Sequence, residues 1–167
     1  MTETARPDVT ALVVPAELVE DLREGTYEVL RRVADAVAEA IGTEAHSMHP
    51  HHQQYRRYRA RASAACALLD DIGWSSTGFP STLRVDLPSH GVVLLSALLG
   101  ALGDAEHALK DVTEGRQKDQ SKRQASIQRV RALSEFTALA FMQAAAIGLA
   151  ELMGARLEDL TRRRGAL

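Results

Sequence analysis

The chain has 167 residues, of which 46% are hydrophobic and only 4% aromatic, and its formal net charge is −2. This length suits one domain, and a core poor in aromatic side chains must be built from leucine, valine and alanine, which favours helices over a β-sandwich. The near-zero charge excludes a global electrostatic attraction to nucleic acid or to a membrane. The single cysteine, Cys66, excludes an internal disulfide and fits a reducing compartment. Residues 1–8 lack the features of a secretion signal, so we expect a cytoplasmic protein.

The first half of the chain is predicted to form a strand followed by two helices. A β-branched run over residues 9–14 is typical of a short strand. Apolar residues then recur at a spacing of three or four over residues 15–41, which predicts a helix, and Gly25 stands at one of these apolar positions. The same spacing predicts a second helix over residues 53–72.

The second half repeats this order around the most hydrophobic part of the chain. Alternating apolar and charged residues at 83–87 predict a half-buried strand. The following helix, residues 88–112, contains twelve successive uncharged residues at 92–103, fewer than the roughly 20 that span a bilayer. We expect protein on most sides of it. The last helix is predicted over residues 126–153 and has no charge from residue 136 to residue 150, so we expect it to be buried on nearly every side.

The predicted order is therefore a strand–helix–helix unit that occurs twice. A proline separates the strand from the helix in each half, at Pro15 and Pro88, which hints at an ancient duplication. We expect a mainly α fold, a single-domain four-helix arrangement in which the two strands, if they pair, form a short two-stranded β ribbon. The helical domain is expected over residues 9–160, between a flexible tail at residues 1–8 and a basic tail at residues 161–167.

Small residues recur every four positions in the two most apolar helices. They are Ser96 and Gly100 in the third helix, and Ala140, Ala144 and Gly148 in the fourth. Glycine inside a helix costs about 0.5–1 kcal/mol relative to alanine, so close approach of the two backbones would explain its presence. The alternative is that Gly100 faces water and is tolerated there.

Histidines gather in the linker between the first two helices, and neutral imidazoles bind zinc, copper or nickel. The weak metal candidates are His46, His49, His51 and His52. Their spacing matches no closed metal site, so a solvated linker is the preferred interpretation. Asp104 and His107 stand three residues apart, as paired ligands on one helix do, but the last helix supplies no second pair of this kind. No resident metal or cofactor is therefore expected.

Basic residues gather in three windows of the sequence, at residues 56–61, 116–131 and 162–164. The candidate nucleic-acid-binding residues are Arg56, Arg57, Arg59 and Arg61 in the second helix, and Lys122 and Arg123 before the last one. If folding brought them to one face, they would form a phosphate-binding patch for nucleic acid. The alternative is that they are ordinary solvated surface residues, which the near-neutral net charge favours.

No motif for a nucleophile, a phosphate loop or a dinucleotide site is present, and no acid–base pair can be identified. We therefore expect a non-enzymatic helical interaction or structural protein. Two nearly all-apolar helices with little aromatic bulk suggest a core completed by a second copy or another protein partner, and no membrane. The alternatives are a nucleic-acid-associated regulator that uses the clustered arginines, and a metal-dependent helical-bundle enzyme.

Overall fold

The computed structural model describes residues 10–43, 52–73, 83–114 and 120–148. In chain order the elements are β1 (Ala11–Val14), the short 3-10 helix η1 (Ala16–Leu18), α1 (Val19–Thr43), α2 (His52–Ile72), β2 (Leu83–Asp86), α3 (Leu87–Glu114) and α4 (Gln120–Ala146). The predicted mainly α fold with four helices and a two-stranded ribbon is confirmed. The two predicted tails, at residues 1–8 and 161–167, lie outside the described residues.

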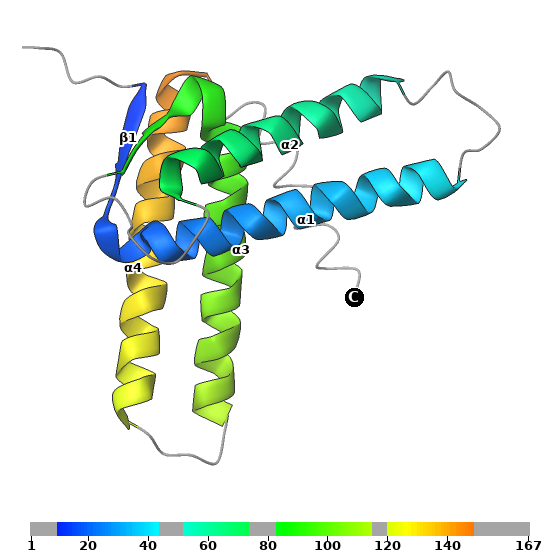
Figure 1. The fold of residues 1–167 in the computed structure, drawn as a ribbon. Coiled ribbons are helices and arrows are strands. Elements are labelled where there is room, and N and C mark those ends of the chain that lie inside the picture. The colour runs from blue at the N-terminus through cyan, green and yellow to red at the C-terminus, as the bar shows by residue number, and fades with distance from the viewer. Residues whose placement is uncertain (1–9, 44–51, 74–82, 115–119, 149–167) are drawn as a thin grey trace, which may run out of the picture.

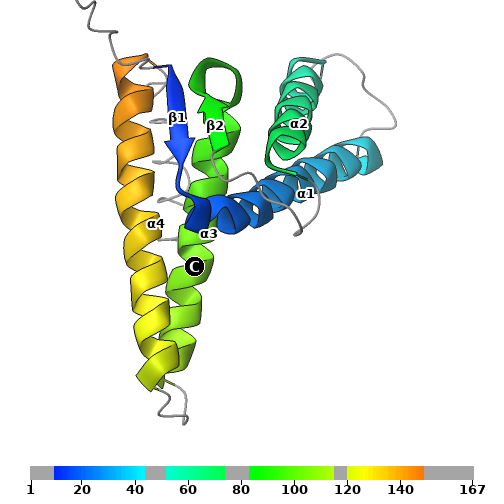
Figure 2. The same ribbon diagram turned by 60° about the vertical axis from the view of Figure 1, so that its left-hand side comes forward.

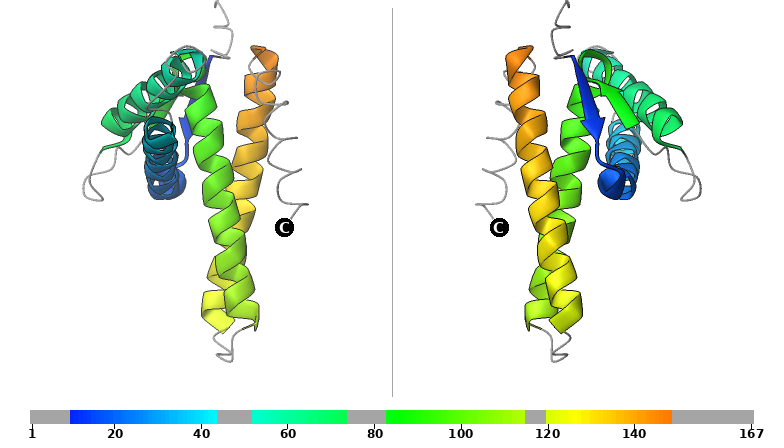
Figure 3. Two further views of the ribbon diagram at one scale, coloured as in Figure 1. Left: turned by 90° about the vertical axis from the view of Figure 1, so that its right-hand side faces the viewer. Right: turned by 90° about the vertical axis from the view of Figure 1, so that its left-hand side faces the viewer.

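The helices form two antiparallel pairs that cross one another. Figure 1 shows α1 and α2 running side by side as one pair, and α3 and α4 as the other. Figure 2 and Figure 3 show that α3 lies between α4 and the α1–α2 pair. α3 contacts α1, α2, α4 and β2, so the most hydrophobic helix of the chain is the central one.

The two strands pair antiparallel and cover one side of the core. Leu12 lies opposite Val85 and Val14 lies opposite Leu83, and all four side chains are buried. The residues between them, such as Val13, face outward, as the two-residue period of a strand requires. The ribbon therefore forms as expected from two segments about seventy residues apart in the sequence.

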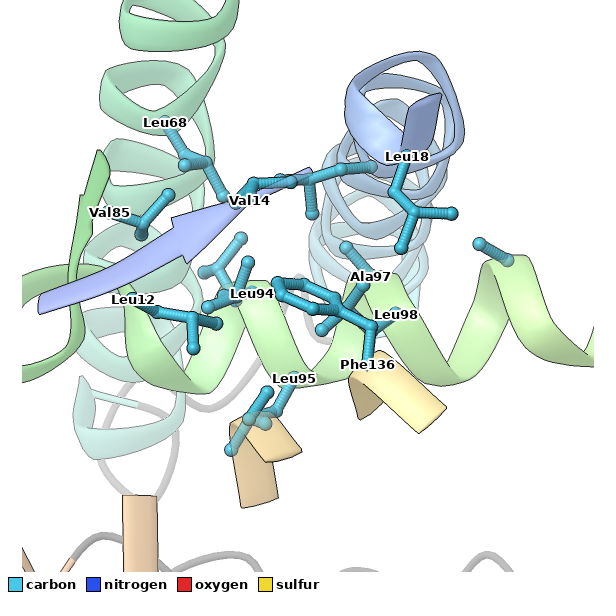
Figure 4. Packing of buried hydrophobic residues seen from close by; sticks show 14 of the residues in the cluster. Leu12, Val14, Leu18, Leu68, Val85, Leu94, Leu95, Ala97, Leu98 and Phe136 are labelled. Carbon is cyan, nitrogen blue, oxygen red and sulfur yellow. The ribbon is translucent and has the colours of Figure 1, made fainter. Parts of the chain in front are cut away.

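Every element contributes to a single hydrophobic core. Figure 4 shows side chains from β1, α3 and α4 in this core, among them Leu12, Leu94 and Phe136. Within α3, no residue between His90 and Gly103 is exposed, which confirms that protein surrounds this part of the helix on most sides. Among the described helices, α3 alone is long and apolar enough to cross a membrane, a property that core helices of soluble proteins share.

Capping fixes where α3 begins. The backbone N–H of Ser89 donates to Oδ2 of Asp86 at 3.0 Å, which satisfies one of the amides that the first turn of a helix leaves unpaired. Pro88 has no N–H to leave unpaired in that same turn. β2 and α3 are therefore joined without a loop, and this junction holds the ribbon against the central helix.

Glu28 on α1 accepts hydrogen bonds from two arginines of the same helix. Nε of Arg31 and Nε of Arg32 each donate to a Glu28 carboxylate oxygen at 2.8 Å. These hydrogen bonds, with Arg31 contributing most, lower the pKa of Glu28 to about 2. Because the folded pKa of Glu28 lies below the unfolded value, its hydrogen bonds with the two arginines contribute stability above about pH 4.5. This contribution is lost as the pH falls towards 2.

We therefore expect Glu28→Gln to reduce, by a small amount, the stability that the protein loses as the pH falls. The wild type should be more stable than this variant at neutral pH, and the difference should shrink between about pH 4.5 and pH 2. Urea unfolding of both proteins at several pH values gives the difference in their free energies of unfolding. The other carboxylates titrate in both proteins, so their contribution drops out of this difference. A difference that did not change with pH would contradict the lowered pKa.

Candidate interaction surface

The outward side of α4 is apolar over its last turns. Its inward side carries Leu133, Phe136, Thr137, Ala140 and Ala144, all buried. On the opposite side, Ala138, Leu139, Met142, Ala145 and Ala146 are exposed. Leu139 is 46% exposed and Met142 is 71% exposed. We call these five exposed residues the α4 apolar face.

The expectation that residues 136–150 are buried on nearly every side is wrong for the part that the structure describes. α4 packs mainly on α3, which covers only one side of it. Because residues 136–150 carry no charge, burying them removes no charged group from water. The absence of charge does not show what covers them. Of the large hydrophobic side chains exposed in the described residues, three of four, Ile127, Leu139 and Met142, belong to α4.

The α4 apolar face has clear ends. On its N-terminal side, Nε of Arg131 donates to Oε1 of Glu135 at 2.8 Å, and this hydrogen bond raises the pKa of Arg131. On its C-terminal side, Gly148 has a positive φ of 79°, which ends the helical path. From Ala138 to Ala146 the face is about 12 Å long, at about 1.5 Å per residue.

The predicted close contact of α3 and α4 at glycine is wrong. A Cβ added at Gly100 would meet nothing within 4 Å, and Gly148 is exposed in a turn beyond the end of α4. Gly100 is therefore the tolerated glycine of the alternative interpretation. Ala140 and Ala144 are fully buried in the core, and Ser96 is part-buried, its hydroxyl donating to the Val92 carbonyl at 2.7 Å.

The close backbone approach lies instead where α1 crosses α3. A Cβ added at Gly25 would stand 2.4 Å from the carbonyl oxygen of Ala97 and 3.0 Å from its carbonyl carbon. Both residues are buried. Gly25 occupies an apolar position of the helical pattern because the facing backbone leaves no room for a side chain.

The two groups of basic residues do not meet. Arg56, Arg57 and Arg59 are exposed near the start of α2, while Arg61 is half-buried. Lys122 and Arg123 are exposed near the start of α4. Figure 1 and Figure 2 place these two helix starts at the far ends of different helix pairs. The structure therefore does not form the single phosphate-binding face on which the nucleic-acid alternative depended.

The metal candidates gain no support from the part of the chain that is described. His46, His49 and His51 lie outside it, and of His52 only the helical backbone is described. His107 is exposed, with Nδ1 2.8 Å from the carbonyl oxygen of Gly103. Within the described ranges no three histidine, cysteine, aspartate or glutamate side chains are close enough to hold a metal ion.

The polar contacts between the helix pairs in the described residues include two that sequence patterns did not reveal. Nε of Arg129 on α4 donates to Oδ1 of Asp21 on α1 at 2.8 Å, although Asp21 belongs to the polar side of its helix by sequence. Nε2 of His90 on α3 lies 3.8 Å from Oδ2 of Asp71 on α2. Contacts between residues this far apart in the sequence leave no periodic signal.

The chain matches no protein-family model, no curated protein and no solved structure. Any function must therefore be argued from the surfaces of the molecule itself. Among those that the structure describes, the α4 apolar face departs most from an ordinary solvated surface, because an exposed leucine and an exposed methionine lie next to each other with no charged residue between them.

Proposed function

We propose that the protein is a non-enzymatic helical interaction protein that self-associates through the α4 apolar face. The observation that carries the proposal is the 71% exposure of Met142 on an uncharged stretch of helix. Burying such side chains contributes about 25 cal/mol per Å² of apolar surface, and methionine adapts its shape easily to a partner. A second copy of the chain is the partner that is always available to such a face.

The other two functions remain weaker proposals. Nucleic-acid binding loses its main support because the exposed arginines of α2 and the basic start of α4 lie apart. A metal-dependent enzyme would need at least part of its ligand set from outside the described residues. We also propose a cytoplasmic location, because a single cysteine fits a reducing compartment. Self-association through the α4 apolar face requires no membrane and no cofactor.

Met142→Glu should abolish self-association and leave the monomer folded. The wild type is expected to shift from monomer to dimer as its concentration rises a hundredfold, and its melting temperature should rise with it. A glutamate at this exposed position would bury a charge in the dimer but remain solvated in the monomer. Light scattering and thermal melts over the concentration range measure both effects.

Ala60→Glu is the matched control, because Ala60 is exposed on α2, which belongs to the other helix pair. It adds the same charge to a different helix, so its dimerisation should equal that of the wild type. A wild type that is strictly monomeric across the whole range would contradict the proposal.

A further inference from the structure

Building on the proposed self-association, we infer that the α4 apolar face binds the same face of a second copy, with the two helices antiparallel and the two Met142 residues on the twofold axis. A twofold contact uses one surface twice, so that surface must complement itself. The α4 apolar face meets this condition in its side-chain sizes, its charges and its length.

The side chains are arranged almost evenly about Met142. Ala138 and Ala146 stand four residues before and after it, and Leu139 and Ala145 stand three residues before and after it. In an antiparallel pair centred on Met142, Ala138 therefore meets Ala146 of the second copy, and Leu139 meets Ala145 of the second copy. Leu139 and Ala138 therefore each lie opposite an alanine, and Met142 packs against Met142 of the second copy, where the flexible methionine side chains can adapt to each other.

The charges beside the face favour the antiparallel arrangement over the parallel one. A parallel pair would place Arg131 beside Arg131 and Glu135 beside Glu135 of the other copy, and would bring the basic starts of both α4 helices together. In the antiparallel pair the two Glu135 residues are fourteen helical residues apart, about 21 Å along the axis. Each Arg131–Glu135 ion pair then stays intact at the rim of the contact.

The length of the face matches a second copy and sets the strength of the dimer. The face ends at Glu135 on one side and at Gly148 on the other, so an identical antiparallel face covers it without reaching a charge. A contact about 12 Å long and about 10 Å wide, the diameter of one helix, covers about 120 Å² per partner, far less than the roughly 800 Å² of a standard interface. The dimer should therefore be weak and reversible, and it should form in the micromolar range or above.

Disulfide trapping in the full-length chain tests the geometry. In a Cys66→Ser background, which removes the native thiol, Met142→Cys should form a disulfide dimer under mild oxidation. Ala138→Cys alone should not, because its two copies would be about 12 Å apart along the helices, beyond the reach of a disulfide. An equal mixture of Ala138→Cys and Ala146→Cys should form the mixed dimer at least about tenfold faster than either variant alone.

The outcomes separate this inference from the proposed function. If light scattering shows a dimer but Ala138→Cys alone cross-links as fast as Met142→Cys, the helices are parallel and the inference is overturned, while self-association stands. If a dimer forms and neither variant cross-links, the dimer uses another surface, which again overturns the inference. A protein that is monomeric at every concentration overturns both the inference and the proposed function, because each requires a dimer.

Discussion

Gly25→Ala should destabilise the protein by about 3 kcal/mol, although alanine is the better helix former. The added Cβ would stand 2.4 Å from the carbonyl oxygen of Ala97, and its three nearest neighbours are all backbone atoms of that residue. A backbone inside a helix cannot turn aside as a side chain can, so α1 and α3 must move apart. This separation would loosen the core on both sides of the crossing, where Leu22 and Leu94 are fully buried.

The matched control is Gly100→Ala, the same substitution in a helix interior with open space around it. Because a Cβ at Gly100 meets nothing within 4 Å, this variant should be stabilised by about 0.4–1 kcal/mol. Urea unfolding of the wild type and both variants gives the two differences on one scale. If Gly25→Ala were neutral or stabilising, α1 and α3 would be farther apart at their crossing than the structure shows.

Periodicity predicted the four helices and β2 because it depends on local geometry, although α4 begins at Gln120, six residues before its predicted start. The spacing of apolar residues indicated α1 and placed Gly25 on its buried side, and the alternation at residues 83–87 indicated β2. The two-stranded ribbon was one arrangement that the sequence allowed, and the structure shows that β1 and β2 do pair in this way. Which helix Gly25 would meet was not predicted, because spacing within one helix carries no information about its partner.

The same limit explains the wrong predictions on α4 and the mixed result for the candidate sites. A stretch without charge is compatible with burial inside the chain and with burial against another chain. The 71% exposure of Met142 shows that the chain itself does not bury the outward side of α4. Five of the six basic candidates are exposed, as the interpretation as solvated surface residues requires, and Arg61 is half-buried. Whether Arg56 and Lys122 share a face depends on how two helix pairs cross, and only the three-dimensional arrangement shows that they do not.

Removing Arg129 from its ion pair with Asp21 should destabilise the fold more than replacing Asp21 does. The Asp21 side chain is 8% exposed, whereas that of Arg129 is 48% exposed. Removing Arg129 leaves a buried carboxylate without this partner, and a buried polar group deprived of its hydrogen bond costs about 1–3 kcal/mol. Asp21→Asn leaves an arginine that water can still reach and a side-chain oxygen that can still accept its hydrogen bond, so that substitution should cost less.

Arg129→Met, Asp21→Asn and the double variant form the test, because methionine keeps much of the volume of the arginine stem. In urea unfolding we expect Arg129→Met to lose about 1–3 kcal/mol, and the double variant to lose less than the sum of the two single variants. Arg131→Met is the control, since Arg131 pairs with Glu135 on its own exposed helix face, and it should change stability little. The expectation is contradicted if Arg129→Met and Asp21→Asn lose equal stability and their effects add in the double variant. The ion pair would then contribute nothing, and the Gly25 crossing and the apolar core would hold the two helix pairs together.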